Sequence, residues 1–383
     1  MSGAGHGEVG GPEVGRPVDL DLARAWLVDP GAGREGPGEL VVRDGILESI
    51  TWLDGPDAAG IDASGVVVAP GFIDLHAHLR EPGNAAAETI ASGLVAAAHG
   101  GYTTVCAMPN TDPAVDTAAA VLAARSAAAA SGSPVRLQIH GAVTADRGGA
   151  RLAALGEMAD AGVVGFSDDG APVASGVIFR SALAYAGALG VPLVEHPEDP
   201  SLTAGAEAAE GLVATILGLR AWPAAGEVTA GARALAILAD VVRDVPTARL
   251  HLTHLSTGDA LALVRDAKAR GLPVTCDVTP HHLALTDEWL AGARRYAWAA
   301  LDDDGRRRDP WRDDALVDPA YDTATRVNPP LRPPPDAAAC LAALVDGTAE
   351  AVATDHAPHA EVDKAVEFGL AANGISGIET ALG

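Results

Sequence analysis

The chain has 383 residues, which is enough for one large domain with an accessory layer. Its 51 acidic residues outnumber 26 basic ones, and the formal net charge of -25 argues against nucleic-acid binding, which needs a basic surface. The 48% hydrophobic content and 44 glycines fit an α/β protein with close helix–strand packing. We expect no membrane span, because no apolar run approaches roughly 18 residues, and no signal peptide at the N-terminus.

The three cysteines, Cys106, Cys276 and Cys340, lie in apolar contexts, and no Cys-X-X-Cys motif occurs. An odd number of isolated cysteines is not typical of a disulfide framework. The sequence therefore predicts buried thiols and a cytoplasmic protein.

The N-terminal part of the chain predicts a tail and a small β layer. Residues 1–15 are rich in glycine, and we expect them to be disordered. Between residues 16 and 65, short apolar runs at 23–27, 38–43 and 46–52 are separated by Gly and Asp-Gly. This pattern favours hairpins, so we assign residues 16–65 to a small β-sandwich portion.

From residue 66 the pattern changes to alternating strands and helices. Eight strands are predicted, at 66–75, 103–107, 135–139, 162–166, 192–195, 249–255, 273–278 and 351–354. Helical segments such as 88–99, 175–189 and 259–270 lie between most of them. Eight β/α units predict an α/β fold of the (β/α)8 TIM-barrel type over residues 66–383. A doubly wound open sheet is the alternative, but it would not gather side chains from so many strands at one point.

Two features depart from this regularity. Residues 298–325 are rich in Asp and Arg, and we interpret them as a long surface loop after the seventh strand, a solvated insertion rather than a functional lid. The sequence stops 28 residues after Asp355 (383 − 355), which is short for an eighth helix and returning strands of the β layer. We therefore expect the C-terminus to be incomplete.

Potential metal ligands stand at the ends of five of the predicted strands. The first strand ends in His76-Ala77-His78, and alternation along a strand points both imidazoles to the same side. Further acid or imidazole groups end later strands, in Gly165–Gly170, Val194–His196, His251–His254 and Ala353–His356. Together they predict a metal-dependent hydrolase. His99 and His140 fall outside this pattern, and we interpret them as ordinary packing or surface residues.

Several longer motifs resemble those of dihydroorotase, in the amidohydrolase superfamily. They are residues 74–83 (DLHAHLREPG), 107–111 (AMPNT), 279–283 (TPHHL), 328–332 (NPPLR) and 353–359 (ATDHAPH). The motifs occur in the family's order, and the resemblance extends over nearly the whole chain from about residue 23. It implies a type I dihydroorotase, which interconverts dihydroorotate and N-carbamoyl-L-aspartate in de novo pyrimidine biosynthesis with zinc as its metal.

Zinc accepts imidazole nitrogen and carboxylate oxygen, and a catalytic zinc keeps a position open. We expect one or two ions, with two favoured: His76, His78 and Asp355 would hold the first, and His196 and His254 the second. His251 and His254 are an odd number of residues apart, so on a regular strand they would face opposite sides. The position of His254 nearer the strand end favours it, and the resemblance agrees.

Many amidohydrolases bridge their two metals with a carboxylated lysine on the fourth strand. This chain has lysine only at Lys268 and Lys364, and neither lies near that strand. The resemblance places the bridge on Asp169, with Asp168 as the other candidate.

The resemblance also implies the substrate contacts. Arg80 lies two residues after His78 and would bind the substrate carboxylate bidentately. His78, Asn110, Asn328, His359 and the backbone at Asn373-Gly374 complete the set. The chain departs from the family at Asn373, where an aromatic residue often precedes the glycine. Asp355 would act as general base and then as general acid.

Two other functions compete with this interpretation. Allantoinases and hydantoinases share the His-X-His motif but normally need the bridging lysine. A non-catalytic dihydroorotase-like partner of aspartate transcarbamoylase would usually lack several of the ligands present here. We expect a homo-oligomer, and an assembly with aspartate transcarbamoylase remains open.

Overall fold

The computed structural model describes residues 19–53 and 60–382 and divides the chain into two compact units, Met1–Phe72 and Ile73–Gly383. The prediction for residues 1–15 lies outside the described residues. The start of the barrel domain at residue 66 stays a prediction.

In its described residues, the first unit contains one five-stranded sheet. Its order is β3-β2-β1-β4, with β5 also paired to β1, where β1 is Leu20–Asp29, β2 Arg34–Arg43, β3 Ile46–Trp52, β4 Ile61–Asp62 and β5 Val67–Val68. The turn between β2 and β3 is Asp44-Gly45, and both residues have positive φ, as a two-residue hairpin turn requires. Ala25, Leu27 and Ala63 form a small buried core. This part of the chain therefore contains a β layer, and its assignment to residues 16–65 as a β-sandwich portion stays a prediction.

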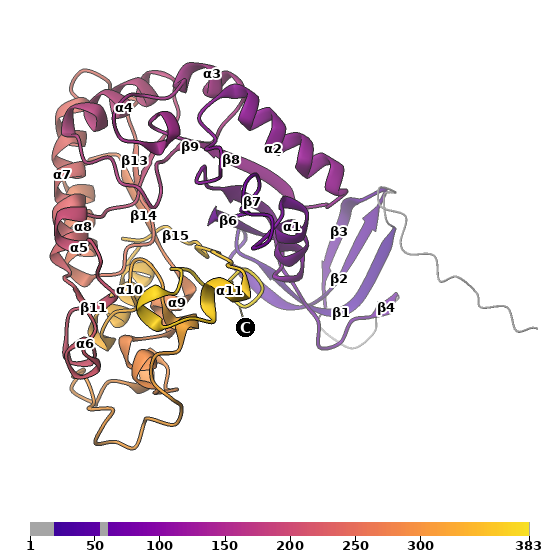
Figure 1. The fold of residues 1–383 in the computed structure, drawn as a ribbon. Helices are drawn as coiled ribbons and strands as arrows, with labels where there is room; N and C mark the ends of the chain where they lie inside the picture. The colour runs from indigo at the N-terminus through magenta and orange to yellow at the C-terminus, as the bar shows by residue number, and fades with distance from the viewer. Residues whose placement is uncertain (1–18, 54–59, 383) are drawn as a thin grey trace, which may run out of the picture. The chain divides into compact units, whose positions relative to one another are not determined.

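The second unit contains eight parallel strands that form a nearly closed barrel (Figure 1). They follow one another around the barrel in chain order: β6 (Phe72–Ala77), β7 (Tyr102–Ala107), β8 (Arg136–Gly141), β9 (Gly165–Phe166), β10 (Leu193–Glu195), β13 (Leu250–Leu252), β14 (Val274–Val278) and β15 (Ala351–Val352). The first and last strands meet where Ala77 forms a parallel bridge with His356. The predicted (β/α)8 fold is confirmed.

The predicted strand at 66–75 is divided in the structure. Val67–Val68 is β5 of the first sheet, and the barrel strand β6 begins only at Phe72. Between them lie Ala69, Pro70 and Gly71. Proline has no amide hydrogen to give to a sheet, so the apolar run cannot continue as one strand.

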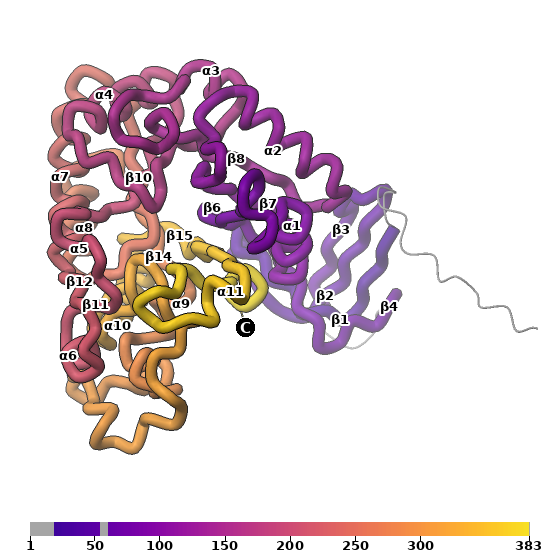
Figure 2. The backbone as a smooth tube through the Cα atoms, in the orientation of Figure 1, coloured from indigo at the N-terminus to yellow at the C-terminus, as the bar shows by residue number. Residues whose placement is uncertain are grey.

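The helices of the second unit cover the outside of the barrel. The main ones are α1 (Ile90–His99), α2 (Ala118–Ser131), α3 (Leu155–Asp160), α4 (Gly176–Ala188), α7 (Ala225–Val241), α8 (Gly258–Ala269) and α10 (Pro334–Val345). Consecutive outer helices contact one another, as α4, α7 and α8 do at one side of Figure 2. Thr89, Thr117 and Thr257 cap the N-termini of α1, α2 and α8 by accepting backbone N–H groups.

Short elements fill the connections between the barrel units. They are α5 (Pro200–Thr203), α6 (Leu212–Leu217), α9 (Pro280–Ala284), α11 (Glu361–Lys364), the two-stranded sheet of β11 (Ala208–Ala209) and β12 (Ala221–Trp222), and five 3-10 helices, η1 (Ala145–Arg147), η2 (Asp287–Ala291), η3 (Ala297–Ala299), η4 (Thr323–Thr325) and η5 (Phe368–Leu370). All three cysteines are free and buried, as predicted. Among the described residues, no helix is both long and apolar enough to span a membrane.

The charged segment 298–325 differs from the expected solvated insertion in how it is anchored. Arg307 donates two hydrogen bonds to Asp287 at 2.9 and 3.0 Å, and it also pairs with Glu288. Both acids are fully buried, and Arg295 bonds Glu288 at 2.7 Å. Because buried charges need partners, Arg307 holds the segment against the body of the unit.

Candidate metal centre

The predicted metal ligands meet beyond the C-terminal ends of five barrel strands. His76 lies in β6 and His78 just after it, Asp169 follows β9, and His196 follows β10. The other two ligands, His254 and Asp355, follow β13 and β15. All six side chains are buried. In a barrel of this type, residues from separate strands converge at this end and form the active site.

Asp169 lies at the centre of the group, with one oxygen toward each pair of imidazoles. Its Oδ2 is 3.4 Å from His76 Nε2 and 3.5 Å from His78 Nε2. Its Oδ1 is 3.3 Å from both His196 Nδ1 and His254 Nε2. Two triads with metal-binding spacing therefore share this one carboxylate.

The tautomers of the imidazoles fit a cation in each triad. His78 Nδ1 lies 2.8 Å from the Asn110 Oδ1 acceptor, so it carries the hydrogen and Nε2 is left with a lone pair. His196 Nε2 lies 2.9 Å from Glu198, which leaves its Nδ1 with a lone pair in the same way. These lone pairs face a second ring nitrogen at 3.3 and 3.0 Å, as well as the carboxylate oxygens. Lone pairs at these distances repel one another unless a positive charge lies among them. The imidazole nitrogens and carboxylate oxygens of each triad are ligands that suit zinc.

The carboxylates set the proton affinity of the cluster. Burial alone would lower the pKa of His76, but Asp169 and Asp355 raise it to about 9. Burial likewise opposes protonation of His196, and Asp169 and Glu198 raise its pKa to about 10. Protons are therefore the competitors that a metal ion must displace.

Asp168 and Asp169 are neighbours in sequence but have different surroundings. Asp168 accepts hydrogen bonds from the backbone N–H groups of Val143 at 2.8 Å and Thr144 at 3.1 Å, and from the Thr144 hydroxyl. It ties β9 to the segment after β8. Only Asp169 reaches the imidazoles.

Three site residues have positive φ although none is glycine: Arg80 at 57°, His254 at 40° and Asp355 at 47°. This conformation costs energy and occurs preferentially at functional sites. At His254 it has a clear consequence. The chain leaves β13 after Leu252, so the alternation rule no longer applies and His254 turns into the metal site. His251 stays on the strand and bonds Asp277 instead.

Comparison with known proteins identifies the family. A family model described as Dihydro-orotase-like matches residues 65–259. The curated dihydroorotase of Anaeromyxobacter dehalogenans is 44% identical over 93% of this chain and 75% of its own length. That of Pelotomaculum thermopropionicum is 42% identical over 96% of this chain and 78% of its own. The chain belongs to the dihydroorotase family. It is thereby an enzyme of the class that hydrolyses cyclic amides.

Solved structures support the fold. The L-hydantoinase (dihydropyrimidinase) from Arthrobacter aurescens superimposes with a TM-score of 0.71 at 24% identity, over 95% of this chain and 75% of that one. At this level of identity the likeness concerns the amidohydrolase barrel alone.

The residues implied as substrate contacts of a dihydroorotase form two groups near the metal ligands. In the first, Arg80 Nη2 is 3.3 Å from His359 Nε2, and His359 is 2.7 Å from the carbonyl oxygen of Asn373. The backbone groups at Asn373-Gly374 are already engaged, since the Gly374 N–H donates to the Arg326 carbonyl at 2.9 Å. Asn110 is engaged with His78, as described above.

The second group joins the substrate side to the second metal triad. The Asn328 amide donates to Glu198 at 3.0 Å, and Glu198 in turn bonds His196. The Asn328 Oδ1 is buried without a hydrogen-bond partner. Glu198, Asn328 and Asn373 line one polar pocket of about 220 Å³, together with Arg326.

Sequence reasoning missed three residues that hold the ligands in place: Glu198 behind His196, and Thr253 and Asp277 behind His76 and His254. A signal existed for two of them. Glu198 lies two residues after His196, and Asp277 is a lone charge in the apolar strand β14. Nothing in the sequence distinguishes Thr253 from the threonines around it.

Proposed function

We propose that this chain is a zinc-dependent dihydroorotase with a binuclear centre. The observation that carries the proposal is Asp169 between two pairs of imidazoles, in a chain of the dihydroorotase family without a lysine at the fourth strand. His76, His78, Asp169 and Asp355 would hold the first ion, and Asp169, His196 and His254 the second. Bound zinc supplies Lewis acidity, which activates water and polarises the substrate carbonyl.

In the hydrolytic direction, water adds to the ring amide carbonyl carbon of dihydroorotate and the bond from this carbon to the ring nitrogen breaks. We assign the proton transfer to Asp355. Although its burial opposes ionisation, His78 and His76 lower its pKa, so Asp355 is an ionised carboxylate at neutral pH, the form that a general base requires. It accepts a proton from water and then gives this proton to the departing nitrogen. In reverse, the same group serves the cyclisation of N-carbamoyl-L-aspartate.

We assign recognition of the substrate carboxylate to Arg80. Its side chain is half-buried, its Nε donates to the Pro358 carbonyl oxygen, and its Nη2 lies 3.3 Å from His359 Nε2. Nη1 has no hydrogen bond to any described residue, which leaves it available to an anion. The unpartnered Oδ1 of Asn328 is an acceptor for a substrate N–H group, and His78, Asn110, His359, Asn373 and Gly374 would complete the pocket.

The function is tested by assaying the zinc-loaded protein with dihydroorotate, N-carbamoyl-L-aspartate, hydantoin and allantoin. We expect interconversion of the first pair only. Turnover of hydantoin or allantoin with none of dihydroorotate would contradict the proposal. No activity in a metal-loaded, folded protein would favour a non-catalytic partner of aspartate transcarbamoylase.

Three broader assignments accompany this function: a place in pyrimidine biosynthesis, a cytoplasmic location and a homo-oligomeric state. Gel filtration with light scattering tests the oligomer. The same measurement with added aspartate transcarbamoylase tests an assembly of the two proteins.

A further inference from the structure

We propose that Asp277 is a positioning residue that holds ligands of both metal sites from behind, and that His251 fixes it from inside the barrel. Asp277 lies in β14 and is fully buried. None of the metal triads includes it. The proposal rests on the metal centre proposed above.

The first contact fixes the backbone of a ligand for the second metal. Asp277 Oδ1 accepts the N–H of His254 at 2.6 Å. The ladder between β13 and β14 ends at Leu252, and a backbone bond resumes only at Leu255, whose N–H donates to the Asp277 carbonyl at 3.0 Å. The carboxylate therefore replaces the missing ladder acceptor where His254 has positive φ. Without it, a buried N–H would lose its partner in a strained turn.

The second contact sets the tautomer of a ligand for the first metal. The Thr253 hydroxyl lies 3.3 and 3.4 Å from the two oxygens of Asp277 and 2.7 Å from His76 Nδ1. A hydroxyl that donates to the carboxylate accepts from Nδ1, which then carries the hydrogen. His76 Nε2 is left with its lone pair toward Asp169. Such outer partners of metal-binding histidines raise metal affinity by orienting the ring.

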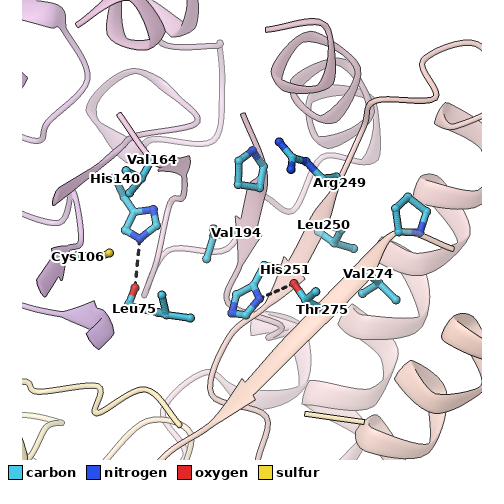
Figure 3. A pocket seen from close by; sticks show the side chains of 12 residues that line it. Leu75, Cys106, His140, Val164, Val194, Arg249, Leu250, His251, Val274 and Thr275 are labelled. Atoms are coloured by element: carbon cyan, nitrogen blue, oxygen red, sulfur yellow. Dashed lines mark hydrogen bonds between the residues drawn. The ribbon is translucent and has the colours of Figure 1, made fainter. Parts of the chain in front are cut away.

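The third contact comes from the interior of the barrel. His251 Nε2 lies 2.7 Å from Asp277 Oδ2, and its Nδ1 lies 2.8 Å from the Thr275 hydroxyl. The ring of His251 lines a cavity of about 480 Å³ near the N-terminal ends of β9, β10, β13 and β14 (Figure 3). Each carboxylate oxygen of Asp277 therefore accepts a hydrogen bond, Oδ2 from the His251 ring and Oδ1 from the backbone N–H of His254.

His140 provides a matched control in the same cavity. It is a buried imidazole that bonds the Leu75 carbonyl at 3.2 Å (Figure 3). Among the described residues, no hydrogen bond connects it to Asp277. Substitution of either histidine changes the packing of the cavity, whereas only substitution of His251 removes a hydrogen bond to Asp277.

The test measures zinc affinity by competition with a chelator, and the visible spectrum of the cobalt-loaded protein, in the full chain. We expect Asp277→Asn to weaken affinity at both sites by about 10- to 100-fold and to change the cobalt spectrum. Thr253→Val should weaken one site only, and Thr253→Ser should restore it. His251→Gln should weaken binding, while His140→Gln should bind zinc as the parent does.

Failure of this proposal differs from failure of the metal centre. A parent protein that binds no zinc would overturn the metal centre itself. A parent that binds zinc, with Asp277→Asn and Thr253→Val folded and binding equally well, would overturn the positioning role alone. Should Asp277→Asn not fold, Thr253→Val, in which a methyl group replaces the hydroxyl, still tests the proposal. Reduced thermal stability with unchanged zinc affinity would show a purely structural role.

Discussion

Two histidines of the metal centre, His76 and His196, and His140 in the barrel cavity lie in opposite electrostatic surroundings. At the C-terminal ends of the strands, carboxylates raise the pKa of His76 to about 9 and that of His196 to about 10. In the cavity toward the N-terminal ends, burial lowers the pKa of His140 to about 4. The imidazole is thus a proton-binding group at His76 and His196 and a neutral packing group at His140, and at His78 burial outweighs the same carboxylates and lowers the pKa. Its neighbours decide which, and the chemistry follows the carboxylates.

The largest effect is expected from removing the proposed proton carrier. Asp355→Asn should lower kcat by about 10²- to 10⁴-fold, because an amide cannot relay a proton. It should keep much of its zinc, since the amide oxygen still coordinates weakly. The measurement is steady-state turnover together with metal content per chain. Near-normal turnover in the zinc-loaded variant would rule out Asp355 as the general base.

The second test separates the neighbouring aspartates. Asp169→Ala should lower occupancy of the second metal more than the first, because His76, His78 and Asp355 remain for the first. Asp168→Ala should keep its zinc but lose about 1–3 kcal/mol of stability, because the buried N–H groups of Val143 and Thr144 lose their acceptor. Metal analysis and thermal unfolding measure the two effects.

The same samples test the bridge without lysine. Lys268 is bonded to Thr348 and Glu350, and Lys364 to three backbone carbonyls, so neither belongs to the metal triads. Zinc uptake should therefore not depend on bicarbonate. If the parent needs bicarbonate, or if only Asp168→Ala loses the second metal, the assignment of Asp169 is wrong.

A smaller effect is expected from the substrate arginine. Arg80→Met should raise KM by about 10- to 100-fold, in line with about 1.5–3 kcal/mol for hydrogen bonds to a charged group. Metal content should stay the same, because Arg80 belongs to neither triad. Steady-state kinetics and metal analysis check both statements. An unchanged KM would remove Arg80 from the substrate site.

The smallest expected effect is the release of protons when zinc binds. At pH 8 the metal-free His76 and His196 are protonated, so binding of two zinc ions should release about two protons per chain. Calorimetry in buffers of different ionisation enthalpy measures this number. His140→Gln should leave it unchanged, whereas release of no protons would contradict the raised pKa values.

The same shifts predict how the stability of the metal-free protein depends on pH. The folded pKa values of His76 and His196 lie above the ordinary value of 6.5. Their stabilisation is therefore complete below pH 6.5 and is lost as the pH rises through 9 to 10. The melting temperature of the metal-free chain should fall over this range, and zinc should remove most of the dependence.

The sequence by itself determined the barrel and the identity of the ligand candidates. Strand–helix alternation is a local property, since it follows from which residues can bury one face. His76 and His78 could be paired from the period of two along β6. The motifs around Arg80 and Asp355 were sufficient to predict the family.

Only the tertiary structure separated Asp169 from Asp168, because both follow the same strand and their partners come from other strands. It also explained how His254 reaches the metal site. Alternation by itself could not decide between His251 and His254, and the positive φ of His254 ends the alternation at this point. Glu198, Thr253 and Asp277 gain their roles from hydrogen bonds to residues on other turns and strands. A linear pattern records the type of each side chain, but the distance between two strand ends exists only once the barrel has closed.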